Sequence, residues 1–171
     1  MRYFEDLTVG TVWPLGTHTF TAEDIKRFAT AFDPQPFHVD EAAAERSHFG
    51  RLCASGWHTV SIWMRLNVLN MQRMAQEMQA AGEPLARKGP SPGFEDLKWL
   101  KPVHAGDAVT YETEIAARRP SRSRPGWGLV TLRNSGRNQR GELVLTFQSH
   151  VFVEMRAAEP TAEADEALAD Q

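Results

Sequence analysis

Apolar positions in the first half of the chain follow helical spacing. The first set lies three, one and three positions apart, on one helix face: Ile25, Phe28, Ala29 and Phe32. Thr21 is suited to begin this helix as its N-cap, with Asp24 three positions later. Pro34 should end it, because a residue before proline is pushed out of the helical region. Asp40 can cap a second short helix over 41–46.

A longer helical pattern begins at Ser55-Gly56. One face repeats at spacings of three and four: Trp57, Val60, Met64, Val68, Met71, Met74 and Met78. The opposite face is also apolar: Ile62, Trp63, Leu66 and Leu69. A helix that is apolar all round is typical of a buried helix. The pattern therefore predicts one buried helix over about 56–80, ended by Gly82 and Pro84.

From Phe94 onward the apolar period changes to two, which is typical of strands. Residues 109–115 and 143–153 alternate clearly, and shorter strands are expected around Leu97–Trp99 and Trp127–Thr131. Turn residues separate the strands: 105–107, 120–126 and 134–141. The last two strands then form a hairpin within an antiparallel meander. Together the two halves predict an α+β fold in which a curved sheet wraps around the long helix.

Length and charge limit the classes of protein that fit this pattern. The 171 residues suit one domain over 1–156, followed by an acidic stretch over 157–171 that we expect to be disordered. The formal charge of −3 becomes +2 without that tail, which holds five of the 22 acids and no base. Neither value suits a nucleic-acid binder. The single cysteine, Cys53, and the absence of a signal-like or membrane-spanning run favour a cytoplasmic protein.

The densest polar segment is Asp33-Pro-Gln-Pro-Phe-His-Val-Asp40. An acid and a histidine five positions apart on a proline-stiffened turn can converge on one water molecule. Asp33 and His38 could then exchange protons with it. The alternative is structural, with Asp33 capping the helix end or the turn and His38 packed at the surface.

The start of the long helix, Ala54-Ser-Gly-Trp-His58, is the second candidate. Helix N-termini carry unpaired N–H groups and a positive dipole end. Aimed at a carbonyl, the N–H of Gly56 could act as an oxyanion hole. The alternative is an ordinary Ser or Gly cap. Trp57 and Trp63 could line an apolar slot or could simply pack in the core.

Several segments in this order resemble the MaoC-like acyl dehydratases, close relatives of the (R)-specific enoyl-CoA hydratases. The shared segments are YFEDLTVG (3–10), DPQPFHVD (33–40), SHFG (47–50), ASGWHT (54–59) and FEDLKWLKPV (94–103) with Gly106-Asp107. The resemblance covers roughly residues 3–155. One position departs from it, because Gln35 stands where many (R)-specific hydratases carry Asn.

The resemblance implies a hot-dog fold, a homodimer or larger homo-oligomer, and a hydro-lyase of fatty acid metabolism. Its substrate would be an acyl-CoA or acyl-carrier-protein thioester, converted between the trans-2-enoyl and (R)-3-hydroxyacyl forms. Asp33 and His38 would be the catalytic pair, and the Gly56 N–H would polarise the thioester carbonyl. We further expect four residues to line the substrate site: Gln35, Phe37, Ser55 and Trp57.

Arg118 and Arg119 begin a basic loop that could meet the phosphates of coenzyme A, or could simply be solvated. The histidines lack ligand spacing and nucleotide motifs are missing, so we expect no metal and no cofactor. Cys53 is interpreted as a buried structural thiol. Two other functions stay open: a hot-dog thioesterase and a non-catalytic acyl-CoA-binding module. The first acid after Gly56 is Glu77, which disfavours the thioesterase, and the Asp33–His38 pair disfavours the binding module.

Overall fold

A computed structural model of the chain describes residues 2–156, so the expected acidic tail over 157–171 lies outside the described residues. Five strands form one antiparallel sheet in the order β1-β3-β4-β5-β2. The strands are β1 (Val12–Thr19), β2 (Gly93–Trp99), β3 (Ala108–Pro120), β4 (Trp127–Asn138) and β5 (Leu143–Glu154). The helices are the 3-10 helix η1 (Phe4–Asp6), α1 (Ala22–Phe32), α2 (Pro36–Val39), α3 (Glu41–Glu45) and α4 (Gly56–Ala80).

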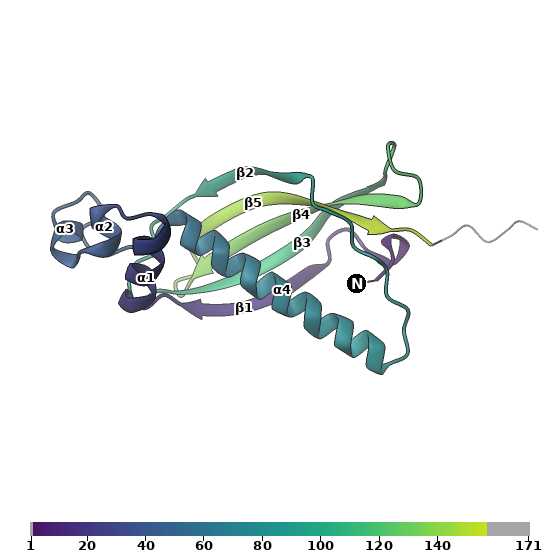
Figure 1. The fold of residues 1–171 in the computed structure, drawn as a ribbon, viewed down its shortest axis with the longest axis horizontal. Helices are drawn as coiled ribbons and strands as arrows, with labels where there is room; N and C mark the ends of the chain where they lie inside the picture. Colours follow the sequence, from purple (N-terminus) through teal and green to yellow (C-terminus); the bar gives the residue numbers. More distant parts are fainter. Residues whose placement is uncertain (1, 157–171) are drawn as a thin grey trace, which may run out of the picture.

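The sheet curves along the long helix α4, which crosses one of its faces (Figure 1). The short helices α1, α2 and α3 gather beyond one end of the sheet, next to the beginning of α4. Strands β3, β4 and β5 pair in chain order, and the last two form the expected hairpin. The predicted α+β fold is confirmed. Its geometry brings the two candidate segments, residues 33–40 and 54–58, to the same end of the molecule.

Helix boundaries near these segments follow the capping residues. The Thr21 side chain accepts a hydrogen bond from the Asp24 N–H at 3.1 Å, and α1 ends at Phe32 with Asp33 as its C-cap. Asp40 begins α3 by accepting from the Ala43 N–H at 2.7 Å. The predicted starts and ends of α1 and α3 are therefore correct to within one residue.

Two parts of the sheet differ from the sequence prediction. Strand β1 was not expected, because Pro14 and Gly16 interrupt its pattern; the strand lies at an edge, where proline is tolerated, and it bulges between these two residues. Strand β4 continues through Asn134 to Asn138, where a turn was expected. Asn134 is fully buried, and hydrogen bonds with Thr113 and Ser149 satisfy its side chain within the sheet.

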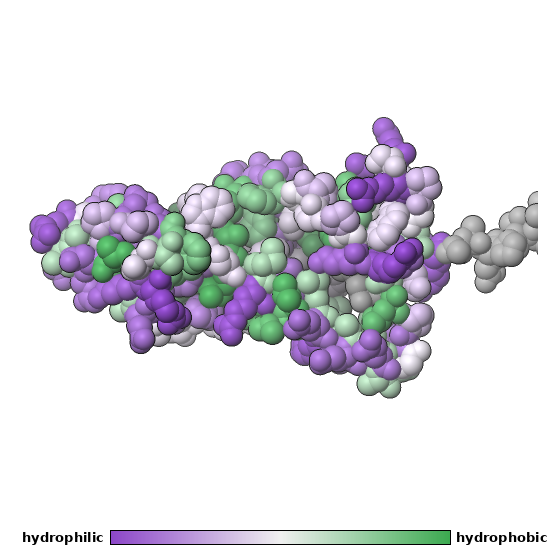
Figure 2. Space-filling model, in the orientation of Figure 1, coloured by the Kyte–Doolittle hydropathy of each residue, from purple (hydrophilic) through white to green (hydrophobic). Residues whose placement is uncertain are grey.

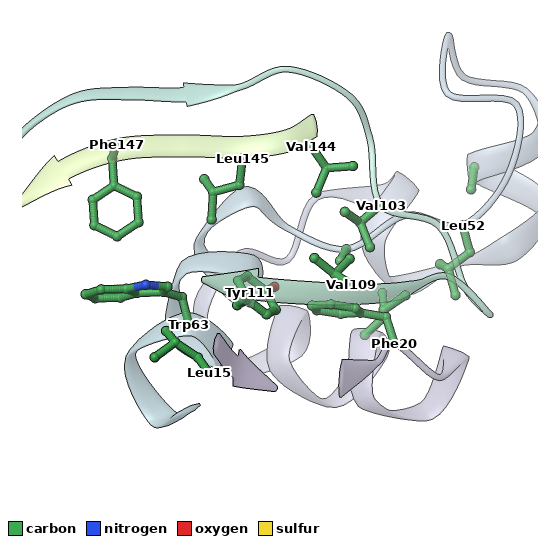
Figure 3. Packing of buried hydrophobic residues seen from close by; sticks show 13 residues of the cluster. Leu15, Phe20, Leu52, Trp63, Val103, Val109, Tyr111, Val144, Leu145 and Phe147 are labelled. Atoms are coloured by element: carbon green, nitrogen blue, oxygen red, sulfur yellow. The ribbon is translucent and has the colours of Figure 1, made fainter. Parts of the chain in front are cut away.

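The main core lies between α4 and the sheet (Figure 3). Trp63 points from α4 towards Phe147 of β5, with the two ring centres 4.7 Å apart in an edge-to-face arrangement. Tyr111 and Leu145 are fully buried beside them. Trp63 is thus a core residue, so core packing rather than an apolar ligand slot explains this tryptophan.

Helix α4 is not buried on all sides within one chain, so that prediction is wrong for the isolated protomer. Its outward face exposes Trp57, Met64, Val68 and Leu69. Hydrophobic surface accordingly gathers over the middle of the face on which α4 lies (Figure 2). None of the helices within 2–156 has the length and apolar character needed to cross a membrane.

Candidate active site

Asp33 stands where the chain leaves α1. Its N–H still bonds to the Ala29 carbonyl at 2.8 Å, while its φ of −154° and ψ of 69° turn the backbone out of the helix. Gln35 holds the carboxylate, since its Nε2 donates to Oδ1 of Asp33 at 2.8 Å. Asp33 does end the helix, as the structural alternative supposed, but its side chain is also directed into a cavity.

His38 lies on the one-turn helix α2 and is 5 % exposed. Its Nδ1 is 2.7 Å from the carbonyl oxygen of Cys53. A carbonyl oxygen can only accept, so Nδ1 must carry the proton. In neutral His38 the other nitrogen, Nε2, is therefore an acceptor, and it lies 3.5 Å from Oδ2 of Asp33.

The surroundings of Asp33 keep its carboxylate ionised. Partial burial opposes ionisation, but hydrogen bonds from the side chains of Ser55 and Gln35, together with the charge of His38, outweigh it and lower the pKa of Asp33. The pair thus presents a carboxylate oxygen and, in the neutral form of His38, an unprotonated imidazole nitrogen to the same small volume.

Gly56 is the first residue of α4. Ser55 caps the helix by accepting from the Trp57 N–H at 3.2 Å, whereas the Gly56 N–H makes no hydrogen bond within residues 2–156. The ring of Trp99 lies over the glycine so closely that a Cβ there would come within 2.5 Å of it. Glycine is thus the residue that lets a ring close over the helix end while leaving a backbone donor free.

One cavity of about 470 Å³ joins these groups. Asp33, His38 and Gly56 all line it, as do three of the expected substrate-site residues, Gln35, Phe37 and Trp57. Ser55 is 1 % exposed and lies behind the wall, where it supports Asp33. Further lining residues carry no signal in the sequence that would have marked them: Phe49, Thr59, Trp99, Lys101, Val103 and Val144. Trp99 is the last residue of β2 and Lys101 follows it two positions later, so the pairing of that strand with β5 brings both here.

Arg118 and Arg119 are not brought to this cavity. Both lie near the end of β3, ten and eleven residues from its start at Ala108, and ten residues correspond to about 33 Å of strand. Arg118 donates to the Phe4 carbonyl at 2.8 Å and its guanidinium stacks on the Phe4 ring. A role for these arginines with coenzyme A phosphates remains a prediction without support from the geometry of a single chain.

Cys53 is buried behind His38, with Sγ 3.6 Å from Nδ1. Burial and the nearby charge of Asp33 raise the pKa of its thiol to about 11, so the sulfur is protonated and unsuited to act as a nucleophile. Over residues 2–156, His, Cys, Asp and Glu side chains form no group of three that could hold a metal ion.

This arrangement can bind a water molecule between the Asp33 carboxylate and the His38 imidazole. It can also direct the Gly56 N–H at a carbonyl group of a ligand. It defines a class of protein: a single antiparallel sheet wrapped on one long helix, with an Asp–His pair facing that helix's N-terminus.

Comparison with known proteins agrees with this class. Residues 14–132 match the family described as MaoC like domain, and the chain belongs to that family. A MaoC-like dehydratase from Rhodospirillum rubrum is 42 % identical, with a TM-score of 0.75 over 92 % of this chain and 100 % of the other. The (R)-hydratase from A. caviae involved in PHA biosynthesis is 26 % identical, with a TM-score of 0.62 over 89 % of this chain and 99 % of the other.

A mesaconyl-CoA hydratase from Cereibacter sphaeroides is 36 % identical over 64 residues, which are 37 % of this chain and 18 % of that protein. The fold is thus the hot-dog fold expected from the resemblance. At the level of the family, the chain is a hydratase or dehydratase.

Proposed function

We propose that this protein interconverts trans-2-enoyl thioesters and (R)-3-hydroxyacyl thioesters by adding or removing water. The observation that carries the proposal is the pair of acceptors, Asp33 Oδ2 and His38 Nε2, 3.5 Å apart in one cavity with the free N–H of Gly56. General acid–base groups and an oxyanion donor are what this reaction requires.

In the hydration direction, a water molecule donates its two O–H bonds to the two acceptors. As its oxygen bonds to C3 of the enoyl group, one acceptor takes a proton, and the C2–C3 π electrons move towards the thioester carbonyl. The protonated member of the pair then delivers that proton to C2. The sum is addition of H and OH across the double bond, and the pair returns to its starting state.

Negative charge develops on the thioester oxygen during this step. The Gly56 N–H, at the positive end of a 25-residue helix, is a donor that needs no reorganisation to meet it. Removing one such donor from an oxyanion hole typically slows an enzyme by roughly 100- to 1000-fold. In this proposal the helix end supplies electrostatic stabilisation and the Asp–His pair supplies proton transfer.

The proposed substrate carrier is coenzyme A or an acyl carrier protein, and the proposed setting is the cytoplasm. We also propose that a second copy of the chain covers the apolar strip on α4, defined as Met64, Val68 and Leu69, each at least 37 % exposed in one protomer. Contiguous apolar surface of this kind is typical of a protein interface.

The test is a panel of trans-2-enoyl-CoA substrates, starting with crotonyl-CoA, assayed with the wild-type protein. Loss of enoyl absorbance and formation of the (R)-3-hydroxyacyl product are expected. Thiol release is followed in parallel with the saturated acyl-CoA. Release of thiol without loss of enoyl absorbance would replace the proposal with a thioesterase, and binding without either reaction would replace it with a binding module.

A further inference from the structure

A second cavity lies at the other end of α4. It has a volume of about 290 Å³, which leaves room for roughly ten non-hydrogen atoms. Five apolar side chains line it from the sheet and the N-terminal segment: Leu7, Trp13, Ile115, Leu132 and Val151. Helix α4 closes one side with Asn67, Asn70, Met71 and Met74, which lie on one helix face. The segment that returns from α4 to the sheet contributes Lys88 (Figure 1).

In the part of the chain that the structure describes, two nitrogen donors in this wall have only sulfur atoms as acceptors. Nζ of Lys88 is 3.0 Å from Sδ of Met71, and Nδ2 of Asn70 is 3.6 Å from Sδ of Met74. A thioether is a weak acceptor, so neither nitrogen has a strong protein acceptor within residues 2–156. Asn70 is only 8 % exposed, and a buried amide without a good acceptor costs free energy. An oxygen ligand in the cavity would offer both nitrogens a stronger acceptor than sulfur.

The charge of Lys88 also lacks a counterpart. No carboxylate within residues 2–156 lies within 4.0 Å of its Nζ. Two other charged residues line the cavity, and both have partners: Arg156 holds Asp6 through hydrogen bonds of 2.9 and 2.6 Å, and Arg2 lies 3.5 Å from Glu83. Lys88 as a whole residue is exposed, but its ammonium lies against the wall of the cavity. The partial loss of solvent there lowers the pKa of Lys88.

The position of Lys88 is fixed by the backbone. Residue 88 forms an antiparallel bridge with Val153 of β5, and the flanking Gly89 N–H donates to the Phe152 carbonyl at 2.8 Å. On the other side, the Arg87 N–H donates to the Glu154 carboxylate at 2.7 Å. The lysine therefore projects from an anchored segment, as a binding residue requires.

From these contacts we infer that the cavity is a binding site for a small amphipathic carboxylate. The carboxylate would take hydrogen bonds from Lys88 and Asn70, replacing the two sulfur contacts, and the hydrocarbon part would lie against the apolar wall. Charge-assisted hydrogen bonds of this kind are among the stronger polar contacts in proteins.

This site is separate from the Asp33–His38 cavity within one chain. No residue lines both cavities, and Asn67 stands eleven residues beyond Gly56, about 16 Å along the helix. Trp63, packed on Phe147, lies on α4 between Gly56 and Asn67 and lines neither cavity. The ligand is thus a free carboxylic acid rather than the end of an acyl group held at the first site, and the inference does not rest on the proposed function.

Isothermal titration calorimetry with octanoate tests the inference, and octanamide is the neutral ligand of the same size. Octanoate is expected to bind with a Kd below about 1 mM, at least tenfold tighter than octanamide. Lys88→Met and Asn70→Leu should each weaken octanoate binding at least tenfold. Lys98→Met, at an exposed lysine on β2, is the matched control and should leave it unchanged.

Asp33→Asn shows which cavity is occupied, and it should leave octanoate affinity unchanged whether or not the protein hydrates enoyl thioesters. Three results would overturn the inference: equal affinity for octanoate and octanamide, no effect of Lys88→Met, or loss of octanoate binding in Asp33→Asn. Failure of octanoate to bind at all would overturn it as well.

Discussion

At the scale of single residues, the candidate active site depends on contacts that fix orientation. The Cys53 carbonyl sets which nitrogen of His38 carries the proton, and Gln35 holds one oxygen of Asp33. Gly56 depends on a different contact, the Trp99 ring that covers it. That contact makes the glycine testable apart from the acid–base pair.

Gly56→Ala is expected to destabilise the protein by roughly 1–3 kcal/mol, because the new Cβ would come within 2.6 Å of two Trp99 ring atoms and displace the ring. Urea unfolding measures the change. Trp99→Ala is the reference background, in which adding Gly56→Ala should cost much less, since the clash is gone. An equal cost in both backgrounds would show that Trp99 is not the reason for glycine here.

At the scale of elements, α4 is held against α1 by an aromatic cluster that contains an uncharged histidine. The His58 ring stacks on Phe28 with centres 4.5 Å apart, and Phe20 meets it edge-on at 5.0 Å. His58 is 5 % exposed, and its Nδ1 has no hydrogen-bond partner in the described residues. Burial lowers the pKa of His58 to about 4.

Stability should therefore fall as the pH drops below 6.5. Between pH 6.5 and 4 the unfolded chain binds a proton at His58 that the folded chain does not, so this group makes stability rise with pH by up to about 1.4 kcal/mol per unit. Above pH 6.5 its contribution is constant. Urea unfolding over this range should show a steeper slope for the wild type than for His58→Phe.

The residual slope in His58→Phe is expected to come from His18 and His104, whose pKa values burial also lowers. Identical slopes for wild type and His58→Phe would contradict an uncharged buried His58.

At the scale of the whole molecule, the apolar strip on α4 is a surface that a single chain leaves exposed and that the expected dimer would cover. Met64, Val68 and Leu69 are exposed in one protomer although the sequence pattern predicts a fully buried helix. A second copy placed on the strip would reconcile the pattern with the structure.

Val68→Asp is accordingly expected to convert a dimer into a monomer with an unchanged circular dichroism spectrum, because a charge at an apolar interface is costly to bury. Light scattering after size-exclusion chromatography measures the mass. Val9→Asp is the matched control, an exposed valine outside the strip that should leave the dimer intact. A wild-type protein that is already a monomer would contradict this assembly.

The sequence predicts much of this fold because local signals agree with it: the Thr21 and Asp40 caps, the long apolar helix and the alternating strands. It does not predict β1, whose proline and glycine are tolerated only because neighbouring β3 places it at an edge. Within the candidate site, spacing singles out Asp33, His38 and Gly56 as candidates, and the resemblance to MaoC-like dehydratases supplies the roles expected of them. Trp99 and Lys101 could not, since strand pairing rather than sequence distance brings them to the cavity.

The central claim is that Asp33 and His38 act as the acid–base pair, and the kcat of enoyl-CoA hydration in matched variants tests it most directly. Asp33→Asn and His38→Gln should each lower kcat by roughly 100- to 10,000-fold. Asp40→Asn, which changes a neighbouring acid that only caps α3, should remain close to the wild type. Full activity in Asp33→Asn, or an equal loss in Asp40→Asn, would contradict the account.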